Sequence, residues 1–175
     1  MNIHDVLEAF NKHEKWLKSE TGGGRLVLDG EDLSHMKLWN KRLSQAILRN
    51  CNLTGTDLFL TDCREIDLTN SDLSNARINS CCFNNGTLAS ANLTGAYTLY
   101  ARFLKTNIVG TIGKTFTSLY LPSVSVVHVD TQVGINRFCY SVSGAIEHID
   151  FIVKEEKVAP EDKEELLAFL KTLPQ

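Results

Sequence analysis

Residues Cys51 to Asn75 read CNLTG TDLFL TDCRE IDLTN SDLSN when they are divided into groups of five. The second residue of every group is Asn or Asp, the third is leucine or cysteine, and the first is small in all groups except the one that begins with Ile66. A fixed short period means that each unit stacks on a copy of itself. The sequence therefore predicts a solenoid, whose function should be sought first on its exposed surfaces.

The same register runs from Leu28 to Ile108, and its third position is nearly always large and apolar. From Ala46 onward, the residue two places earlier is mostly small. We therefore expect each unit to direct one large and one small side chain inward. Larger residues break the small-residue rule in the first coil, so we expect the regular rod to begin near Ala46 and the preceding turn to be distorted; these residues are Leu26, Glu31, Met36 and Lys41.

Four units, twenty residues apart, carry the pattern most clearly: Glu31-Asp32-Leu33-Ser34-His35, Cys51-Asn52-Leu53-Thr54-Gly55, Ser71-Asp72-Leu73-Ser74-Asn75 and Ala91-Asn92-Leu93-Thr94-Gly95. This pattern resembles the pentapeptide-repeat family. The resemblance implies an all-β solenoid, a right-handed quadrilateral β-helix with four pentapeptides per coil and about four coils in this chain. On one side of such a coil Asp32, Asn52, Asp72 and Asn92 form a column, in which amides alternate with carboxylates and permit hydrogen bonds between coils.

The sequence divides into three segments: residues 1–24, 25–110 and 111–175. The first has apolar residues at helical spacing between Asn2 and Glu20 and ends in Gly22-Gly23-Gly24, which predicts an amphipathic capping helix and a glycine linker. The second is the repeat. In the third, Ser123–Val129 and Arg137–Val142 resemble strands around a turn at Gly134-Ile135-Asn136. Two helices are expected after them, Gly144–Val153 and one that begins at Pro160, to complete a C-terminal cap.

The two ends of the chain are also similar to a subgroup of pentapeptide-repeat proteins from phages and prophages. The matching pieces are His13-Glu14-Lys15-Trp16-Leu17, Val126-Val127-His128-Val129, Phe138-Cys139-Tyr140, Ser143-Gly144-Ala145-Ile146-Glu147-His148 and Ala168-Phe169-Leu170-Lys171-Thr172-Leu173. This resemblance implies a phage-like origin and leaves the mechanism open.

Composition argues against several classes of protein. The net charge of -3 at pH 7 carries no basic footprint of nucleic-acid binding, and no apolar run is long enough for a membrane span or signal peptide. The five histidines lie outside metal and nucleophile motifs, and the cysteines form no CxxC pair. We therefore expect a cytoplasmic protein without catalytic residues, metal or cofactor, in which Cys51, Cys63 and Cys81 are buried, reduced and structural.

The strongest candidate interface is the side that carries Leu38, Leu58, Ile78 and Thr98 inward, because its outward positions are apolar where the family has small polar residues. Exposed aromatic columns suggest a protein interface. A terminal segment folded over this side is the structural alternative. The candidate partner-binding residues are Trp39, Phe59, Leu60, Tyr97, Leu99 and Tyr100. The next side is mildly basic and extends this surface toward an acidic partner; its charges are Lys41, Arg42, Arg64, Arg102 and Lys105, with Asp62 and Glu65 among them.

We therefore expect a non-enzymatic protein-binding module of phage or prophage origin that modulates a host or phage protein. The first alternative is an inhibitor or protector that mimics DNA, since some members of the family resemble a DNA duplex and occupy topoisomerases such as gyrase. The candidate acidic strip for that role is Asp57, Asp62, Asp67 and Asp72. Against it, the repeat segment holds eight acidic and nine basic residues. The second alternative is a rod that dimerises through its C-terminal helices at Leu166, Leu167, Leu170 and Leu173.

Overall fold

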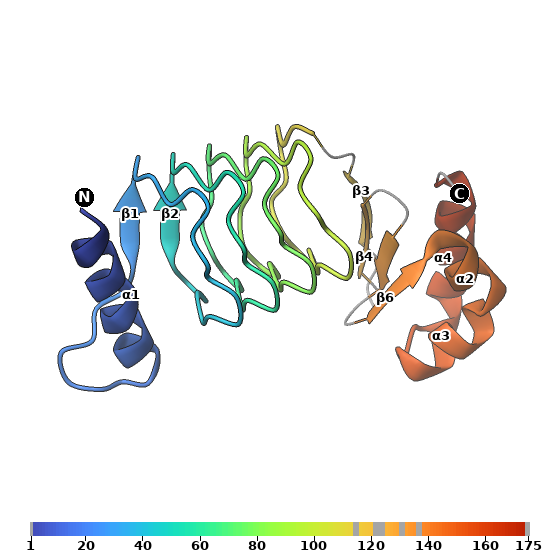
Figure 1. Ribbon diagram of the computed structural model, residues 1–175. Coiled ribbons are helices and arrows are strands. Elements are labelled where there is room, and N and C mark those ends of the chain that lie inside the picture. Colours follow the sequence, from blue (N-terminus) through green and yellow to red (C-terminus); the bar gives the residue numbers. More distant parts are fainter. Residues whose placement is uncertain (1, 114–115, 121–124, 130–131, 136–137, 174–175) are drawn as a thin grey trace.

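The structure is a computed structural model that describes residues 2–113, 116–120, 125–129, 132–135 and 138–173. An N-terminal helix is followed by a long coiled segment, a small antiparallel sheet and three helices (Figure 1). The elements in chain order are α1 (Ile3–Leu17), β1 (Val27–Asp29), β2 (Ile47–Arg49), β3 (Phe116–Tyr120), β4 (Ser125–Val129), β5 (Gln132–Ile135), β6 (Phe138–Ser141), α2 (Val142–Glu147), α3 (Ile149–Glu155) and α4 (Pro160–Thr172).

Parallel backbone pairing joins residues twenty positions apart throughout the coiled segment. Val27 pairs with Ile47, and Ile47 pairs in turn with Asp67. Four such ladders run along the molecule, through residues 27, 47, 67, 87 and 107, residues 32, 52, 72, 92 and 112, residues 37, 57, 77 and 97, and residues 42, 62, 82 and 102. Each coil therefore contains twenty residues and has four sides, as the resemblance to the pentapeptide-repeat family implies.

The first coil joins these ladders as regularly as the later ones, since Val27, Asp32 and Lys37 all have partners one coil above. The expectation of a distorted turn before Ala46 is therefore wrong. The physical reason lies at the end of the coil, where large residues have no coil below them to crowd. Helix α1 is there instead, and its buried Val6 and Phe10 belong to the same apolar core as the leucines of the coils.

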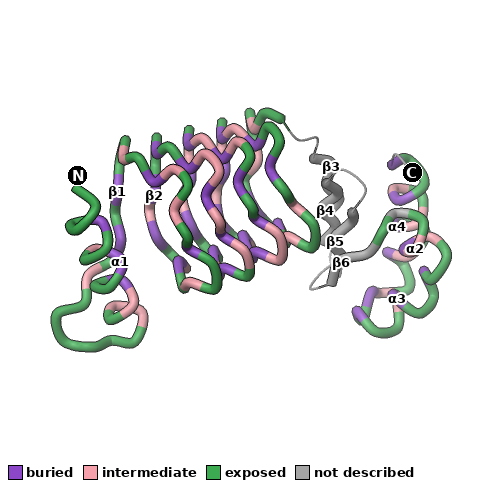
Figure 2. Tube along the Cα trace, viewed as in Figure 1, coloured by how far each residue is buried: buried purple, intermediate pink, exposed green. Residues whose placement is uncertain are grey.

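Buried residues, purple in Figure 2, recur in every coil, and most of them are apolar. The inward leucines from Leu28 to Leu93 are all at most 3% exposed, and Cys51, Cys63 and Cys81 are buried among them as predicted. At one corner the small-residue rule is broken by Ile66, which is fully buried. The next coil has Gly86 at that position, where an added Cβ atom would lie 2.8 Å from the Ile66 carbonyl oxygen. The glycine thus allows the two coils to approach each other.

The polar groups inside the coil are hydrogen-bonded. Hydroxyls at the small inward position donate to the carbonyl oxygen of the inward residue one coil below: Thr56 to Leu33, Thr61 to Leu38, Ser71 to Leu48 and Thr106 to Phe83. The Cys81 thiol makes the equivalent bond to Leu58. These groups therefore satisfy buried carbonyls and are already engaged in structure.

A left-handed residue marks each corner of the coil, because every fifth residue from Gly30 to Gly110 has a positive φ angle. Most of these positions hold Gly or Asn, which adopt this conformation at lower cost than other residues. Bulky or charged residues occupy some of them, including Leu60 and Tyr100 with φ angles of 58° and 59°.

Helix α1 begins at the Asn2 cap, whose side chain accepts a hydrogen bond from the Asp5 amide. Its buried face ends in His13, which stacks on Trp16 and whose Nδ1 accepts a hydrogen bond from the Leu26 amide. Among the described residues, no helix combines the length and the apolar character that crossing a membrane requires.

The C-terminal segment differs from its prediction. Four strands form an antiparallel sheet in the order β3-β4-β5-β6, and Gly134 and Ile135 lie within β5 instead of in a turn. Asn136 and part of the predicted strand Ser123–Val129 lie outside the described residues. The predicted helix over residues 144–153 is divided at His148 into α2 and α3, whereas α4 begins at Pro160 as expected.

The leucines proposed for dimerisation lie inside this C-terminal segment. Leu166 and Leu170 are fully buried and Leu173 is 5% exposed, in a cluster with Ala145 and Ile152. Leu167 is partly buried against the same cluster. Leu166, Leu170 and Leu173 thus pack within their own chain, and dimerisation through the C-terminal helices stays a prediction.

Candidate functional site

The six candidate residues lie on one side of the coil, which we call the aromatic side: Trp39, Phe59, Leu60, Tyr97, Leu99 and Tyr100. The bridges from Lys37 through Asp57 and Arg77 to Tyr97 define this side. The Asn40 amide donates to the Phe59 carbonyl and the Ser80 amide to the Leu99 carbonyl, which fixes the order of the corner residues along it. The structure therefore brings all six together on one surface, as the spacing of the sequence predicts.

Five of these residues are exposed despite their apolar side chains. The exposed fractions are 56% for Trp39, 51% for Leu60, 64% for Tyr97, 46% for Leu99 and 55% for Tyr100. In the part of the chain that the structure describes, neither terminal segment therefore covers these five residues. Helix α1 makes its polar contacts elsewhere, at Leu26 and through an ion pair between Glu14 and Lys41.

The aromatic side is divided in two by the third coil, which contributes Asn79 and Ser80 at the positions where its neighbours carry apolar residues. Trp39, Phe59 and Leu60 lie before this polar break, and Tyr97, Leu99 and Tyr100 lie after it. Phe59 is half-buried because the Arg77 guanidinium lies over its ring, 4.1 Å from the ring centroid. The surface thus consists of two apolar patches, with Arg77 and the polar residue Asn79 between them.

Leu60 and Tyr100 are unfavourable residues for their backbone positions. Both lie at left-handed corners and both expose half of their side-chain surface. A left-handed conformation costs a residue with a Cβ atom about 1–2 kcal/mol. Asn or Gly at these corners would reduce both the backbone strain and the exposed apolar surface. The same corner of the first coil holds Asn40.

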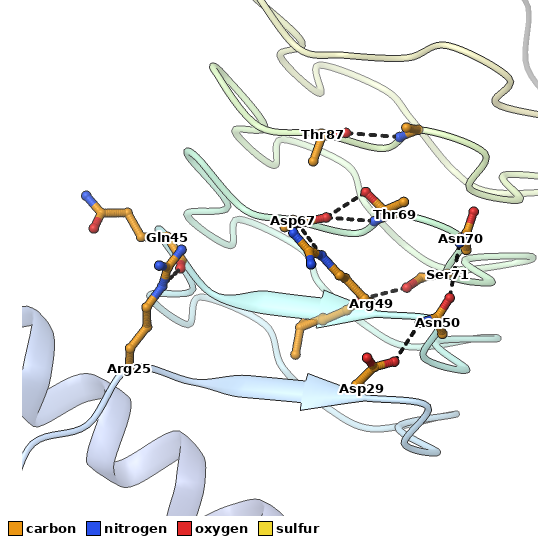
Figure 3. Close-up of polar contacts among 12 residues, drawn as sticks. Arg25, Asp29, Gln45, Arg49, Asn50, Asp67, Thr69, Asn70, Ser71 and Thr87 are labelled. Carbon is orange, nitrogen blue, oxygen red and sulfur yellow. Dashed lines mark hydrogen bonds and ion pairs between the residues drawn. The ribbon is translucent and has the colours of Figure 1, made fainter.

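The acidic strip is largely neutralised by arginines. Arg49 donates to Asp67 at 2.6 Å, Arg64 binds both carboxylate oxygens of Asp62 at 2.8 and 2.6 Å, and Arg77 lies 3.3 Å from Asp57. Figure 3 shows the pair of Arg49 and Asp67, with Thr69 donating to the same carboxylate. Of the four, only Asp72 has no ion pair with an arginine or lysine among the described residues. Its Oδ1 accepts a hydrogen bond from the side-chain amide of Asn92.

The arginines also affect proton binding. Burial acts to raise the pKa of Asp62, but Arg64 outweighs it and holds this pKa below its usual value. At Asp67 burial is likewise outweighed, by Arg49 and Thr69, and the pKa is lowered. Both carboxylates therefore stay ionised and paired at neutral pH.

Each of the four aspartates also has a structural function within its own repeat. Its Oδ1 accepts the amide of the residue two positions later, which closes the turn at the corner; the donors are Phe59, Arg64, Thr69 and Ser74. Asn52 and Asn92 make the same contact with Thr54 and Thr94. The side-chain amides of Asn52 and Asn92 also donate to Asp32 and Asp72 one coil below. The predicted hydrogen bonds of the Asp and Asn column are thus confirmed. Turn formation accounts for the acidic residues without a DNA-like function.

No group of three or more potential metal ligands is present among the described residues. Cys139 lies outside the described side chains. Sequence reasoning missed a groove of about 460 Å³ where the aromatic side meets the basic side. Its lining includes residues at twenty-residue spacing, Leu60 with Ser80 and Arg64 with Asn84, which is the signal that could have located it.

A family model described as "Pentapeptide repeats (8 copies)" matches residues 32–62. Together with the four-sided, twenty-residue coil, this match decides the family. The chain belongs to the pentapeptide-repeat family. No curated protein matches the sequence, and none of the comparisons bears on the resemblance to the phage and prophage subgroup, which stays a prediction.

Several solved pentapeptide-repeat structures are similar to this chain. A protein from the thylakoid lumen of Arabidopsis thaliana is 31% identical, over 55% of this chain and 68% of that one, with a TM-score of 0.34. HetL of Nostoc sp. strain PCC 7120, involved in heterocyst differentiation regulation, is 23% identical over 51% of this chain and 47% of its own, with a TM-score of 0.39. QnrB1, a plasmid-mediated fluoroquinolone resistance protein, is 23% identical over 54% and 50%, with a TM-score of 0.43.

This chain therefore spans about half the length of HetL and QnrB1. Since all three TM-scores are below 0.5, we draw nothing on function from these structures.

Proposed function

We propose that this pentapeptide-repeat protein is a non-enzymatic binding module that holds a partner protein against its aromatic side. The single observation that carries the proposal is the exposure of five large apolar side chains on one side of a rod. Such a surface costs solubility and is uncommon on a protein that acts alone. Aromatic residues of this kind supply most of the binding free energy at protein interfaces.

The left-handed corners support the same proposal. At Leu60 and Tyr100, Asn would relieve backbone strain and remove exposed apolar surface at once. The apolar residues at these corners are thus explained by a binding role better than by stability. On this basis, Leu60→Asn with Tyr100→Asn should weaken partner binding while the fold is preserved or strengthened.

The test is affinity capture of partner proteins from a lysate of the source cells, with the wild-type chain and two variants on identical supports. A protein captured by the wild type should be lost with Trp39→Ser plus Phe59→Ser and with Leu60→Asn plus Tyr100→Asn. The matched control is Gln45→Asn plus Lys105→Asn, which makes the same exchange at left-handed corners of another side. Equal capture by wild type and both aromatic-side variants would remove the proposal.

We do not extend the proposal to DNA mimicry. That mechanism needs an acidic surface, and the contacts of Asp57, Asp62 and Asp67 with arginines argue against one. It stays a prediction, which competition between duplex DNA and the captured partner would test, since displacement by DNA should weaken with salt.

A further inference from the structure

A groove lies at the corner between the aromatic side and the adjacent side of the coil, which is built on the ladder of Arg42, Asp62, Cys82 and Arg102. Its volume is about 460 Å³. Thr61 and Cys82 are 1% and 6% exposed and form its bottom. The exposed Leu60 gives it one apolar wall, so the groove continues the first patch of the aromatic side.

Its polar lining has an excess of hydrogen-bond donors and positive charge. Asp62 and Arg64 neutralise each other through two hydrogen bonds. Arg102 also lines the groove, is exposed, and has no ion pair with an acidic side chain among the described residues. Asn84 uses its Oδ1 to accept the Leu104 amide. Within the described part of the chain no acceptor is present for its Nδ2 group. The groove therefore offers a guanidinium and an amide donor to a ligand.

The backbone around the groove is already paired. The Cys82 amide donates to the Thr61 carbonyl and the Arg102 amide to the Cys81 carbonyl, while the Cys82 carbonyl accepts from the Cys63 amide. A partner thus cannot add a strand here, as peptides do at open sheet edges. Recognition has to occur through side chains.

We propose that this groove binds an acidic segment of the partner protein, with the carboxylate of an Asp or Glu on Arg102 and a neighbouring apolar side chain against Leu60. The inference rests on the proposed function and names the chemistry of the partner. Arginine binds carboxylates through two parallel hydrogen bonds, which gives both affinity and orientation. A nucleic acid fits the groove less well, because nucleic-acid binding needs several unpaired cations along one surface. In the groove Arg64 is already paired with Asp62.

The probe is a phage-displayed library of random dodecapeptides, selected on the immobilised full-length chain. Peptides enriched on the wild type should contain Asp or Glu next to an apolar residue. A synthetic peptide of this kind should bind about tenfold or more weakly when its acidic residues are replaced by Asn and Gln, and to a similar extent with Arg102→Ala. Arg102→Lys should restore part of the affinity, because it keeps the charge but not the two-pronged geometry.

Arg42→Ala is the matched control, since Arg42 lies in the same ladder, is exposed and does not line the groove. It should leave peptide affinity unchanged. Circular dichroism of each variant checks that the coil is folded. Enriched peptides without acidic residues, no enrichment at all, or unchanged affinity in Arg102→Ala would each overturn the proposal, as would displacement of the peptide by duplex DNA.

Cys82 gives a readout specific to the groove. In a Cys139→Ser chain, Cys82 is the most exposed of the remaining cysteines, since Cys51, Cys63 and Cys81 are at most 1% exposed. Bound peptide should slow the reaction of this thiol with Ellman's reagent, whereas an unchanged rate would place the peptide elsewhere and refute the proposal.

Failure of the groove and failure of the proposed function are separable. Trp39→Ser plus Phe59→Ser lies outside the groove and should retain peptide binding. If this variant loses partner capture while the peptide binds independently of Arg102, only the proposal for the groove is refuted. If this variant still captures the partner while peptide binding depends on Arg102, only the proposed function of the aromatic side is refuted.

Discussion

Arg77 joins the two surfaces that the sequence singles out, because its guanidinium lies 4.1 Å from the centroid of the Phe59 ring while its Nη1 is 3.3 Å from Asp57 Oδ2. One cation thus covers part of an aromatic residue and neutralises part of the acidic strip. Asp57 and Phe59 lie on the same coil, and Arg77 reaches both from the coil above. The aromatic side and the acidic strip are therefore not independent candidate sites.

Arg77→Ala should destabilise the fold slightly and expose Phe59. Its ion pair is half-exposed, so screening by water keeps the loss small, at about 0.5–1 kcal/mol for the pair and the cation–π contact together. Urea denaturation followed by circular dichroism measures this loss. Arg77→Lys should recover part of it. A loss beyond about 3 kcal/mol would show that Arg77 has a role in the core that these contacts do not explain.

Leu60→Asn and Tyr100→Asn should each raise the free energy of unfolding by about 0.5–1 kcal/mol, because Asn adopts the left-handed conformation at lower cost than other residues with a Cβ atom. Thermal unfolding measures the gain. Asn40→Leu, at the same corner of the first coil, should produce the opposite change. If both Asn variants were less stable than the wild type, the corners would not be strained and this support for the binding role would be lost.

The solenoid was predictable from the sequence because a period of five residues with a large apolar side chain in every unit indicates stacked copies of one unit. The four-sided coil and the aromatic side followed from the resemblance to the pentapeptide-repeat family, which implies a register of twenty residues. The groove did not, since it depends on how Arg64 turns toward Asp62 and leaves Arg102 and Asn84 toward solvent. The sequence pattern also does not predict that Gly86 makes room for the backbone of Ile66, because it does not show which residues of neighbouring coils come into contact. In the C-terminal segment the strands lack a strict period, and Gly134, which favours a turn in the sequence, lies within β5.

Gly86→Ala should destabilise the coil by about 1–3 kcal/mol, the usual cost of excess volume in a packed interior. The added Cβ atom would meet two backbone carbonyl oxygens, of Ile66 at 2.8 Å and of Phe83 at 3.0 Å, and backbone atoms cannot swing aside. The matched control is Gly24→Ala, where no atom lies within 4 Å of the new Cβ. Equal denaturation midpoints for the two variants would contradict the close approach of the coils at this corner.

Ser71→Ala should cost about 1–3 kcal/mol because it leaves two buried backbone groups unpaired. The Ser71 hydroxyl donates to the Leu48 carbonyl at 2.6 Å and accepts from the Cys51 amide at 3.1 Å. Ser74→Ala is the control, since that hydroxyl makes a contact of 3.4 Å with Thr54 at the surface of the same unit. Chemical denaturation distinguishes the two. Similar small losses would indicate that water enters the coil at Ser71.

His13 should make the attachment of α1 to the coil sensitive to acid. Burial lowers the pKa of His13, the Ser44 carbonyl and Glu14 oppose this effect, and Arg25 and Arg42 add to it. A lowered pKa in the folded state means that the unfolded chain binds more protons, so stability rises with pH. Stability should thus be complete above the ordinary value of 6.5 and fall as the pH drops below it. Protonation also places a hydrogen on Nδ1, which then no longer accepts the hydrogen bond from the Leu26 backbone amide.

The free energy of unfolding of the wild type, measured across this pH range, should decrease as the pH falls. In His13→Asn the slope should flatten, because the amide oxygen can accept the same bond without titrating. A wild-type slope in His13→Asn would assign the acid sensitivity to another group.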